Sequence, residues 1–244
     1  MTTVQPVADY SKTQVDRAGQ VLADRLRLVD EGKAIVGQHS PELLKAVEVI
    51  DWWRDEHAKS LSRVSASLSH YVAKEGRPVV AQRLKKFPTI ADKLLREPKM
   101  KLSRMADIGG VRAVLPSQEA AYSIARRLRR NWTITRVRDY VAEPKKDGYR
   151  ALHLINRHRG RLIEVQLRTK LQDAWANSVE ADTRRVAPGL KFGAGPAELR
   201  DFYVALGDFL AIADQEGPMD NALLRRVLSL RDRVVTLRRA HDEP

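Results

Sequence analysis

Two stretches of this sequence indicate its fold most directly: PKKDGYRALH, residues 144–153, and IEVQLRT, residues 163–169. The first is a loop of proline, lysine and glycine that leads into an apolar segment, which predicts a strand over 150–156. In the second, polar and apolar residues alternate, which predicts a strand over 162–167. Arg159 and Gly160 join the two strands. The loop before them places an aromatic ring, Tyr149, among cations.

Helical patterns surround this pair of strands on both sides. Further strands are expected at 111–115, after a turn at the glycine pair 109–110, and at 132–140. Helices are expected at 12–30, 41–57, 61–72, 88–97, 117–130, 169–185, 197–215 and 220–240. Strands that alternate with helices in the middle, with helices at both ends, predict an α/β (α+β) core flanked by helices. The expected division is a helical region 1–80, a core 81–187 and a helical extension 188–244.

The charge of the chain narrows its partners. It has 44 Lys and Arg against 31 Asp and Glu, a net charge of +13. The cations cluster, with eight between Arg83 and Arg104 and six arginines between Arg126 and Arg138. Such clusters favour polyanions, so a nucleoside triphosphate or a nucleic acid is expected. A solvated basic surface would explain the charge alone equally well.

Other features of composition limit the cellular setting. The 244 residues contain no cysteine, which excludes disulfides and thiolate metal sites and agrees with a cytoplasmic protein. No apolar run approaches the roughly 20 residues that a membrane-spanning helix needs. No secretory signal is visible at the beginning of the sequence, so a cytoplasmic protein without membrane contact is expected.

Two acids and a basic helix supply the chemistry. Transfer of a phosphoryl or pyrophosphoryl group needs carboxylates that hold Mg²⁺ and several cations, and Mg²⁺ uses one or two protein carboxylates. Asp107 precedes the glycine pair, and Glu164 lies on an expected strand. Thr89, Lys93 and Arg96 have the spacing of one helix face. Taken singly, either acid is more often structural, and by spacing alone a solvated basic surface explains the helix slightly better.

The aromatic loop allows two readings. Tyr149 beside cations suits stacking on a nucleobase, whereas a lone tyrosine is usually half-buried in a core. His153 on an alternating strand suits an acceptor site, whereas by itself it is more often a buried histidine with its hydrogen bonds satisfied. Trp52 and Trp53 are expected in the core.

Four motifs, in order, resemble the synthetase domain of the RelA/SpoT family of alarmone synthetases. They are RLKKFPTIADK at 83–93, DIGGVR at 107–112, PKKDGYRALH at 144–153 and EVQLRT at 164–169. The resemblance spans roughly residues 45–185. It implies a nucleotidyltransferase-like fold with a mixed sheet, and transfer of the β,γ-pyrophosphate of ATP to a 3′-hydroxyl group.

The resemblance also implies residue roles. Asp107 and Glu164 hold Mg²⁺, and Glu164 also activates the attacking hydroxyl. The remaining residues bind the two nucleotides: Arg83 and Arg112 the adenine of ATP; Lys85, Thr89, Lys93 and Arg96 its phosphates, with threonine where the family usually has serine; Tyr149, Arg138, Lys145, His153 and Gln166 the acceptor.

Two acceptors remain open, together with one inactive alternative. The segment 10–19 and the motif WRDEH at 53–57 resemble toxic small synthetases, which pyrophosphorylate the 3′-terminal adenosine of tRNA and block aminoacylation. That reading implies a toxin with a separately encoded antitoxin and a role in phage defence. The alternative is a (p)ppGpp synthetase with GDP or GTP as acceptor. A catalytically dead RNA-binding module is disfavoured because both acids are retained. The His-Asp pairs of a hydrolase domain are not expected in this chain.

Overall fold

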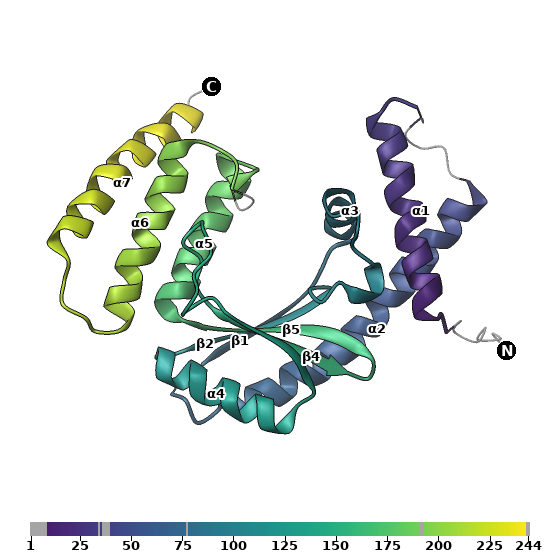
Figure 1. Ribbon diagram of the computed structural model, residues 1–244, viewed down its shortest axis with the longest axis horizontal. Helices are drawn as coiled ribbons and strands as arrows, with labels where there is room; N and C mark the ends of the chain where they lie inside the picture. Colours follow the sequence, from purple (N-terminus) through teal and green to yellow (C-terminus); the bar gives the residue numbers. More distant parts are fainter. Residues whose placement is uncertain (1–8, 34, 36–39, 77, 191–192, 243–244) are drawn as a thin grey trace. The chain divides into compact units, whose positions relative to one another are not determined.

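The computed structural model describes residues 9–33, 35, 40–76, 78–190 and 193–242. Its strands form one mixed five-stranded sheet in the order β1-β2-β5-β4-β3 (Figure 1). The strands are β1 (Val79–Leu84), β2 (Gly109–Leu115), β3 (Ile134–Asp139), β4 (Leu152–His158) and β5 (Arg161–Thr169). The helices are α1 (Lys12–Asp30), α2 (Pro41–Val72), α3 (Phe87–Arg96), η1 (Leu102–Arg104), α4 (Gln118–Asn131), α5 (Lys170–Arg185), α6 (Ala197–Asp214) and α7 (Asn221–Asp242). The predicted fold class, a sheet flanked by helices, is confirmed.

The chain divides into two compact units. Unit 1 comprises Met1–Ser65, Gln82–Val111 and Arg157–Glu164, and unit 2 comprises Ala66–Ala81, Arg112–Asn156 and Val165–Pro244. The elements α2, β1, β2, β4 and β5 contribute residues to both units. Each unit is therefore described by itself below.

Unit 1 has a core built by the first three helices and η1. Helix α1 begins where Ser11 and Gln14 form a reciprocal capping box, which satisfies two backbone N–H groups at the helix start. Its apolar side packs against α3 and η1. An added Cβ on Gly19 would lie 2.9 Å from Cβ of Leu102, so a glycine allows this close approach. Trp53, 1% exposed, lies in the same core, as predicted.

Helix α2 corrects one sequence prediction. The helices expected at 41–57 and 61–72 are one helix of 32 residues, Pro41–Val72. The residues at the expected break are Ala58, Lys59 and Ser60, none of which interrupts a helix, and the buried Leu61, Val64 and Leu68 continue the helical spacing. Ser40 caps the helix start, because its hydroxyl accepts a hydrogen bond from the N–H of Leu43 at 3.1 Å. Residues 37–39, part of the break expected before this helix, lie outside the described residues.

The sheet corrects two further predictions. Strand β1 was not expected, because its six residues are exposed or half-buried without clear alternation. The glycine pair 109–110 was expected as a turn but begins β2. Gly109 is needed there for packing: an added Cβ would lie 2.8 Å from Cδ1 of Ile163 and 3.5 Å from Cβ of Leu61. The predicted β4–β5 turn is confirmed, with Arg159 and Gly160 at φ of 49° and 75°.

Unit 2 contains α4 and the three helices α5, α6 and α7. Figure 1 shows α6 lying between α5 and α7. The apolar residues of α7 recur at alternating spacings of four and three and pack on the core that α5 and α6 share; they are Leu223, Val227, Leu230, Val234 and Leu237. A buried network joins the three helices, because Asp182 on α5 accepts hydrogen bonds from Tyr203 on α6 and Arg238 on α7.

Strand β3 is an edge of the sheet. It pairs antiparallel with β4, and Arg138 lies opposite His153. Among the helices that the structure describes, none is long and apolar enough to cross a membrane.

Candidate active site

In unit 1, Asp107 lies between two lysines. Lys85 Nζ donates to Oδ2 of Asp107 at 2.9 Å, and Lys93 Nζ donates to Oδ1 at 2.8 Å. The lysines come from different places, one directly after β1 and the other on α3. Asp107, Lys85 and Lys93, predicted to bind Mg²⁺ and the phosphates of ATP, are therefore brought together.

The backbone of Lys85 is held on both sides. Its N–H donates to the carbonyl of Ile108 at 2.8 Å. Its own carbonyl accepts from Nε of Arg54 on α2 at 3.2 Å. The residue is 6% exposed, so its ammonium group is fixed beside Asp107 rather than free in solvent. Arg54, part of the WRDEH motif, thus supports a lysine of the predicted site.

The two lysines keep Asp107 ionised. Burial alone would raise the pKa of the Asp107 carboxyl, but the charges and hydrogen bonds of Lys85 and Lys93 outweigh it, and the pKa lies below its usual value. The side chain is 26% exposed, so ligands can reach it. A half-buried, ionised carboxylate beside two ammonium groups suits a metal–phosphate complex, which brings charges of both signs.

Glu164 is the second predicted metal ligand and also lies in unit 1. It is half-buried on β5, next to Ile163, whose side chain contacts Gly109 at the start of β2. The chain segments that carry Asp107 and Glu164 are therefore neighbours. Within the described part of the chain, no group of three or more His, Cys, Asp or Glu side chains could hold a metal. Two carboxylates fit Mg²⁺, which takes its other ligands from phosphate and water oxygens.

The other predicted donor residues are more dispersed. Arg83 is exposed on β1 and Thr89 is half-buried in the first turn of α3. Arg96 donates from Nε and Nη2 to Asp92 one turn earlier on α3, at 3.1 and 2.9 Å. Arg112 belongs to unit 2, where its Nη1 lies 3.0 Å from Oδ1 of Asp173.

In unit 2, the predicted acceptor residues form an aromatic cluster. The rings of Tyr140, Tyr149 and His153 lie edge to face, with centroids 5.1 to 5.9 Å apart. The ammonium group of Lys145 lies 4.8 Å from the centroids of both tyrosine rings. Arg138 donates to the hydroxyl of Tyr140 at 3.0 Å. Cations beside aromatic faces are a suitable setting for a nucleobase and its phosphates.

The hydroxyl group of Tyr149 links this cluster to β5. It accepts a hydrogen bond from Nη2 of Arg168 at 2.9 Å and lies 2.6 Å from Nε2 of His153. Nη2 of Arg168 also donates to Oε1 of Gln166 at 2.9 Å. His153 is 9% exposed and Tyr149 is half-buried, so both residues are structural parts of the fold as well as candidates for binding.

Three residues of this cluster were missed in the sequence: Tyr140, Arg168 and Asp173. Oδ1 of Asp173 lies 3.0 Å from Arg112 and 3.1 Å from Arg168. This carboxylate therefore holds two arginines in place, Arg112, which was predicted, and Arg168, which was not. Arg168 is part of the EVQLRT motif, which was the available signal. Asp173 had none, because Arg112 is distant in sequence and Arg168, five residues earlier, lies on β5 outside the helix that carries Asp173.

The chain resembles known proteins over this region. Residues 82–185 match a family model named RelA_SpoT, described as a region found in RelA / SpoT proteins. The chain is 34% identical over 110 residues to the GTP pyrophosphokinase YwaC of Bacillus subtilis (strain 168), which is 39% of this chain and 52% of that protein. The chain thus spans about half the length of this curated relative.

Solved structures confirm the fold. Small alarmone synthetase 1 of Bacillus subtilis, bound to its product pppGpp, matches with a TM-score of 0.58 and 21% identity, over 68% of this chain and 94% of that one. A GTP pyrophosphokinase family protein from Streptococcus pneumoniae matches with a TM-score of 0.59 and 19% identity, over 68% and 91%. The fold is therefore that of the small alarmone synthetases.

Proposed function

We propose that this chain transfers the β,γ-pyrophosphate of ATP to the 3′-hydroxyl group of an acceptor nucleotide. The observation that carries this proposal is Asp107 with its two lysines, located inside the segment that matches RelA and SpoT proteins. The acceptor oxygen would attack the β-phosphorus, the bond between the α- and β-phosphates would break, and AMP would leave.

On the donor side, the proposal assigns charge neutralisation to unit 1. Asp107 and Glu164 would hold Mg²⁺, which neutralises developing charge on the phosphate oxygens. Lys85, Thr89, Lys93 and Arg96 would bind the triphosphate, and Arg83 and Arg112 the adenine. Glu164 would also accept the proton of the attacking hydroxyl.

On the acceptor side, the aromatic cluster of unit 2 would bind the nucleotide. Tyr149 would stack on the base, and its hydroxyl bonds to Arg168 and His153 would fix the orientation of the ring. The residues proposed to complete the acceptor side are Arg138, Lys145, His153 and Gln166.

We propose the 3′ end of tRNA as the acceptor, which would make the chain a toxin that blocks aminoacylation and would require a neutralising antitoxin. The supporting observation is a row of arginines on α4. Arg126, Arg129 and Arg130 have the spacing of one helix face and all expose their side chains. A nucleic acid would use such a face for its phosphates, whereas a mononucleotide needs no cations outside its pocket.

A guanosine nucleotide is the second candidate. It is favoured by the relatives, since YwaC is named a GTP pyrophosphokinase and the synthetase 1 structure holds pppGpp as its product. The chain would then make ppGpp from GDP, or pppGpp from GTP.

One experiment tests the reaction and separates the acceptors. The protein is incubated with Mg²⁺, ATP labelled at the γ-phosphate, and GDP, GTP or bulk tRNA. Label on RNA whose 3′ end resists periodate selects tRNA, because a modified 3′-hydroxyl no longer forms a vicinal diol. Label on a guanosine nucleotide selects the alternative. No transfer to any acceptor would refute the proposed function.

Matched variants test the assignment of the metal ligands. Asp107→Asn and Glu164→Gln should each lower the rate by roughly 10² to 10³ or more, because lost charge stabilisation in a transition state has this size. Asp55→Asn, an exposed acid on α2, should leave the rate unchanged. Wild-type rates in either metal-site variant would remove the assignment.

A further inference from the structure

We infer that helix α6 positions the loop that carries Tyr149, with Gly207 and Asp208 as the positioning residues. This inference rests on the proposed function, since it takes the loop 145–150 as part of the acceptor side. Helix α6, Ala197–Asp214, lies beyond residues 82–185, the segment that matches RelA and SpoT proteins. The loop lies inside that segment.

The backbones of α6 and the loop touch directly. An added Cβ on Gly207 would lie 2.6 Å from the carbonyl oxygen of Gly148, a distance that no side chain tolerates. Conversely, an added Cβ on Gly148 would lie 2.8 Å from the carbonyl oxygen of Tyr203. Gly148 also has a φ of 88°, which favours glycine. Two glycines thus allow the helix and the loop to meet without side chains between them.

An ion pair makes a second connection, on the other side of Tyr149. Nη2 of Arg150 donates to Oδ1 of Asp208 at 2.8 Å. Gly148 and Arg150 are the two neighbours of Tyr149 in sequence, and both contact adjacent residues of α6, Gly207 and Asp208. Tyr149 is therefore held between two points that α6 fixes.

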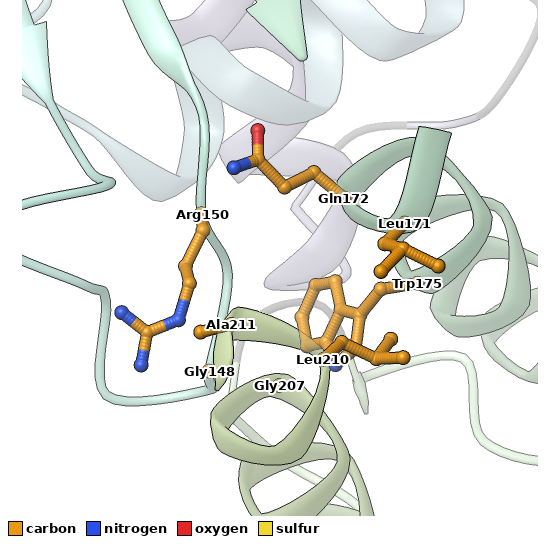
Figure 2. Close-up of a pocket in the computed structure, with 8 residues that line it drawn as sticks. All are labelled: Gly148, Arg150, Leu171, Gln172, Trp175, Gly207, Leu210 and Ala211. Carbon is orange, nitrogen blue, oxygen red and sulfur yellow. The ribbon is translucent and has the colours of Figure 1, made fainter. Parts of the chain in front are cut away.

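Helix α5 makes a third connection, in which Trp175 contacts both Tyr203 of α6 and the ring of Tyr149. Nε1 of Trp175 donates to the carbonyl oxygen of Tyr203 at 2.8 Å, and its ring lies 6.0 Å from that of Tyr149. Figure 2 shows the small pocket at this junction, with Gln172 and Trp175 of α5 on one side and Arg150 on the other. Gly207, Leu210 and Ala211 of α6 complete its wall.

Helix α6 is itself fixed, so it can serve as a support. The hydroxyl of Tyr203 donates to Asp182 at 2.7 Å, and Arg238 of α7 donates to the same carboxylate at 2.7 and 3.0 Å. Tyr203 is 2% exposed. A shift of α6 would break hydrogen bonds of this buried network, so the network holds α6 in place.

The test measures kinetics for each substrate separately. Asp208→Asn should raise the KM for the acceptor roughly two- to fivefold, since exposed ion pairs are weak, and leave the KM for ATP unchanged. Gly207→Ala should raise it more, by tenfold or more, because small displacements at a reacting site have large effects. Asp208→Glu should restore much of the wild-type value. The control is Asp201→Asn, an exposed acid two turns earlier on α6.

A second measurement separates failure of this inference from failure of the proposed function. Hydrogen exchange of the peptide spanning 145–150 should be faster in Asp208→Asn than in Asp201→Asn, whatever reaction the protein catalyses. If the wild-type protein shows no transferase activity but the two variants still differ in exchange, the proposed function alone is refuted. Active wild-type protein in which the Asp208 and Asp201 variants have equal acceptor KM values would overturn the inference, as would equal exchange in the two variants.

Discussion

The hydroxyl group and the ring of Tyr149 have separable roles. The hydroxyl bonds to Arg168 and His153, whereas the ring is the proposed platform for the acceptor base. Tyr149→Ala should raise the KM for the acceptor about 10- to 100-fold, because stacking on an aromatic ring contributes about 1–3 kcal/mol per base. Tyr149→Phe keeps the ring, so its effect should be smaller.

Steady-state kinetics with varied acceptor and saturating ATP measure both variants. Equal loss in the alanine and phenylalanine variants would mean that the hydroxyl network, not stacking, is the main contribution. Normal kinetics in Tyr149→Ala would place the acceptor elsewhere.

The sequence indicated candidate site residues but not all of the partners that hold them. Asp107, Lys85 and Lys93 were identified from residue type and motif, and the structure brings them together. Asp173 was missed because it acts through Arg112 and Arg168, on two different strands. Such a pairing depends on the tertiary fold, which local spacing does not contain.

At the level of elements, the contact between β2 and β5 depends on a missing side chain. Gly109→Ala would place a Cβ 2.8 Å from Cδ1 of Ile163. Overpacking of this kind typically costs about 1–3 kcal/mol of unfolding free energy. Ile163→Val removes Cδ1, so it should partly rescue Gly109→Ala, although alone it destabilises by about 0.5–1.5 kcal/mol.

Denaturant unfolding of both single variants and the double variant gives the coupling energy between the two sites. Additive effects would show that the clash relaxes by another route, and the close approach would then not explain the glycine.

Helix α2 contains a buried histidine that makes stability depend on pH. His57 is 1% exposed, and Nδ1 lies 2.7 Å from the carbonyl oxygen of Trp53. Burial lowers the pKa of His57 from 6.5 to about 4. As pH falls, the unfolded chain binds the proton before the folded chain does. The stability that neutral His57 contributes is therefore complete above pH 6.5 and is lost between pH 6.5 and 4. Its size is roughly 3 kcal/mol.

The measurement is the unfolding free energy of wild type and His57→Gln across this range. The variant should lose less stability than wild type on acidification, by up to roughly 3 kcal/mol. The control His70→Gln removes an exposed histidine from the same helix. Parallel curves for wild type and His57→Gln would mean that His57 is not kept neutral by burial.

Elements with strong local signals were predicted closely, and weak ones were not. Helix α1 begins and ends at the predicted residues, because its periodicity and its cap agree. The false break within α2 came from a polar stretch, 58–60, that is compatible with a helix. Strand β1 carries little alternation, so its pairing with β2 in the sheet, rather than its sequence, gives it its conformation.

At the scale of the molecule, the net charge of +13 predicts that tRNA binding depends more strongly on salt concentration than nucleotide binding does. Replacing Arg126, Arg129 and Arg130 with glutamine should weaken tRNA binding and reduce the slope of log K against log salt concentration by up to about three. Binding of ATP, GDP and GTP should change little.

Arg127 provides the control on the same helix. Its Nη1 donates to the carbonyl oxygen of Tyr71 at 3.2 Å and lies 3.7 Å from Glu75, so it has a structural partner. Arg127→Gln should lower stability without changing the salt slope. An unchanged slope in the triple variant would exclude this face of α4 from RNA binding.

Because Asp107 already has two ammonium counter-ions, a bare divalent cation must compete with both of them. A nucleotide that arrives with its cation instead offers those ammonium groups a new anion at the same moment. Calorimetric titration with MgCl₂ alone should therefore give weak heats, whereas Mg²⁺ and a non-hydrolysable ATP analogue should bind together with strong mutual enhancement. The chain would bind the metal and the nucleotide together as a complex, rather than one after the other.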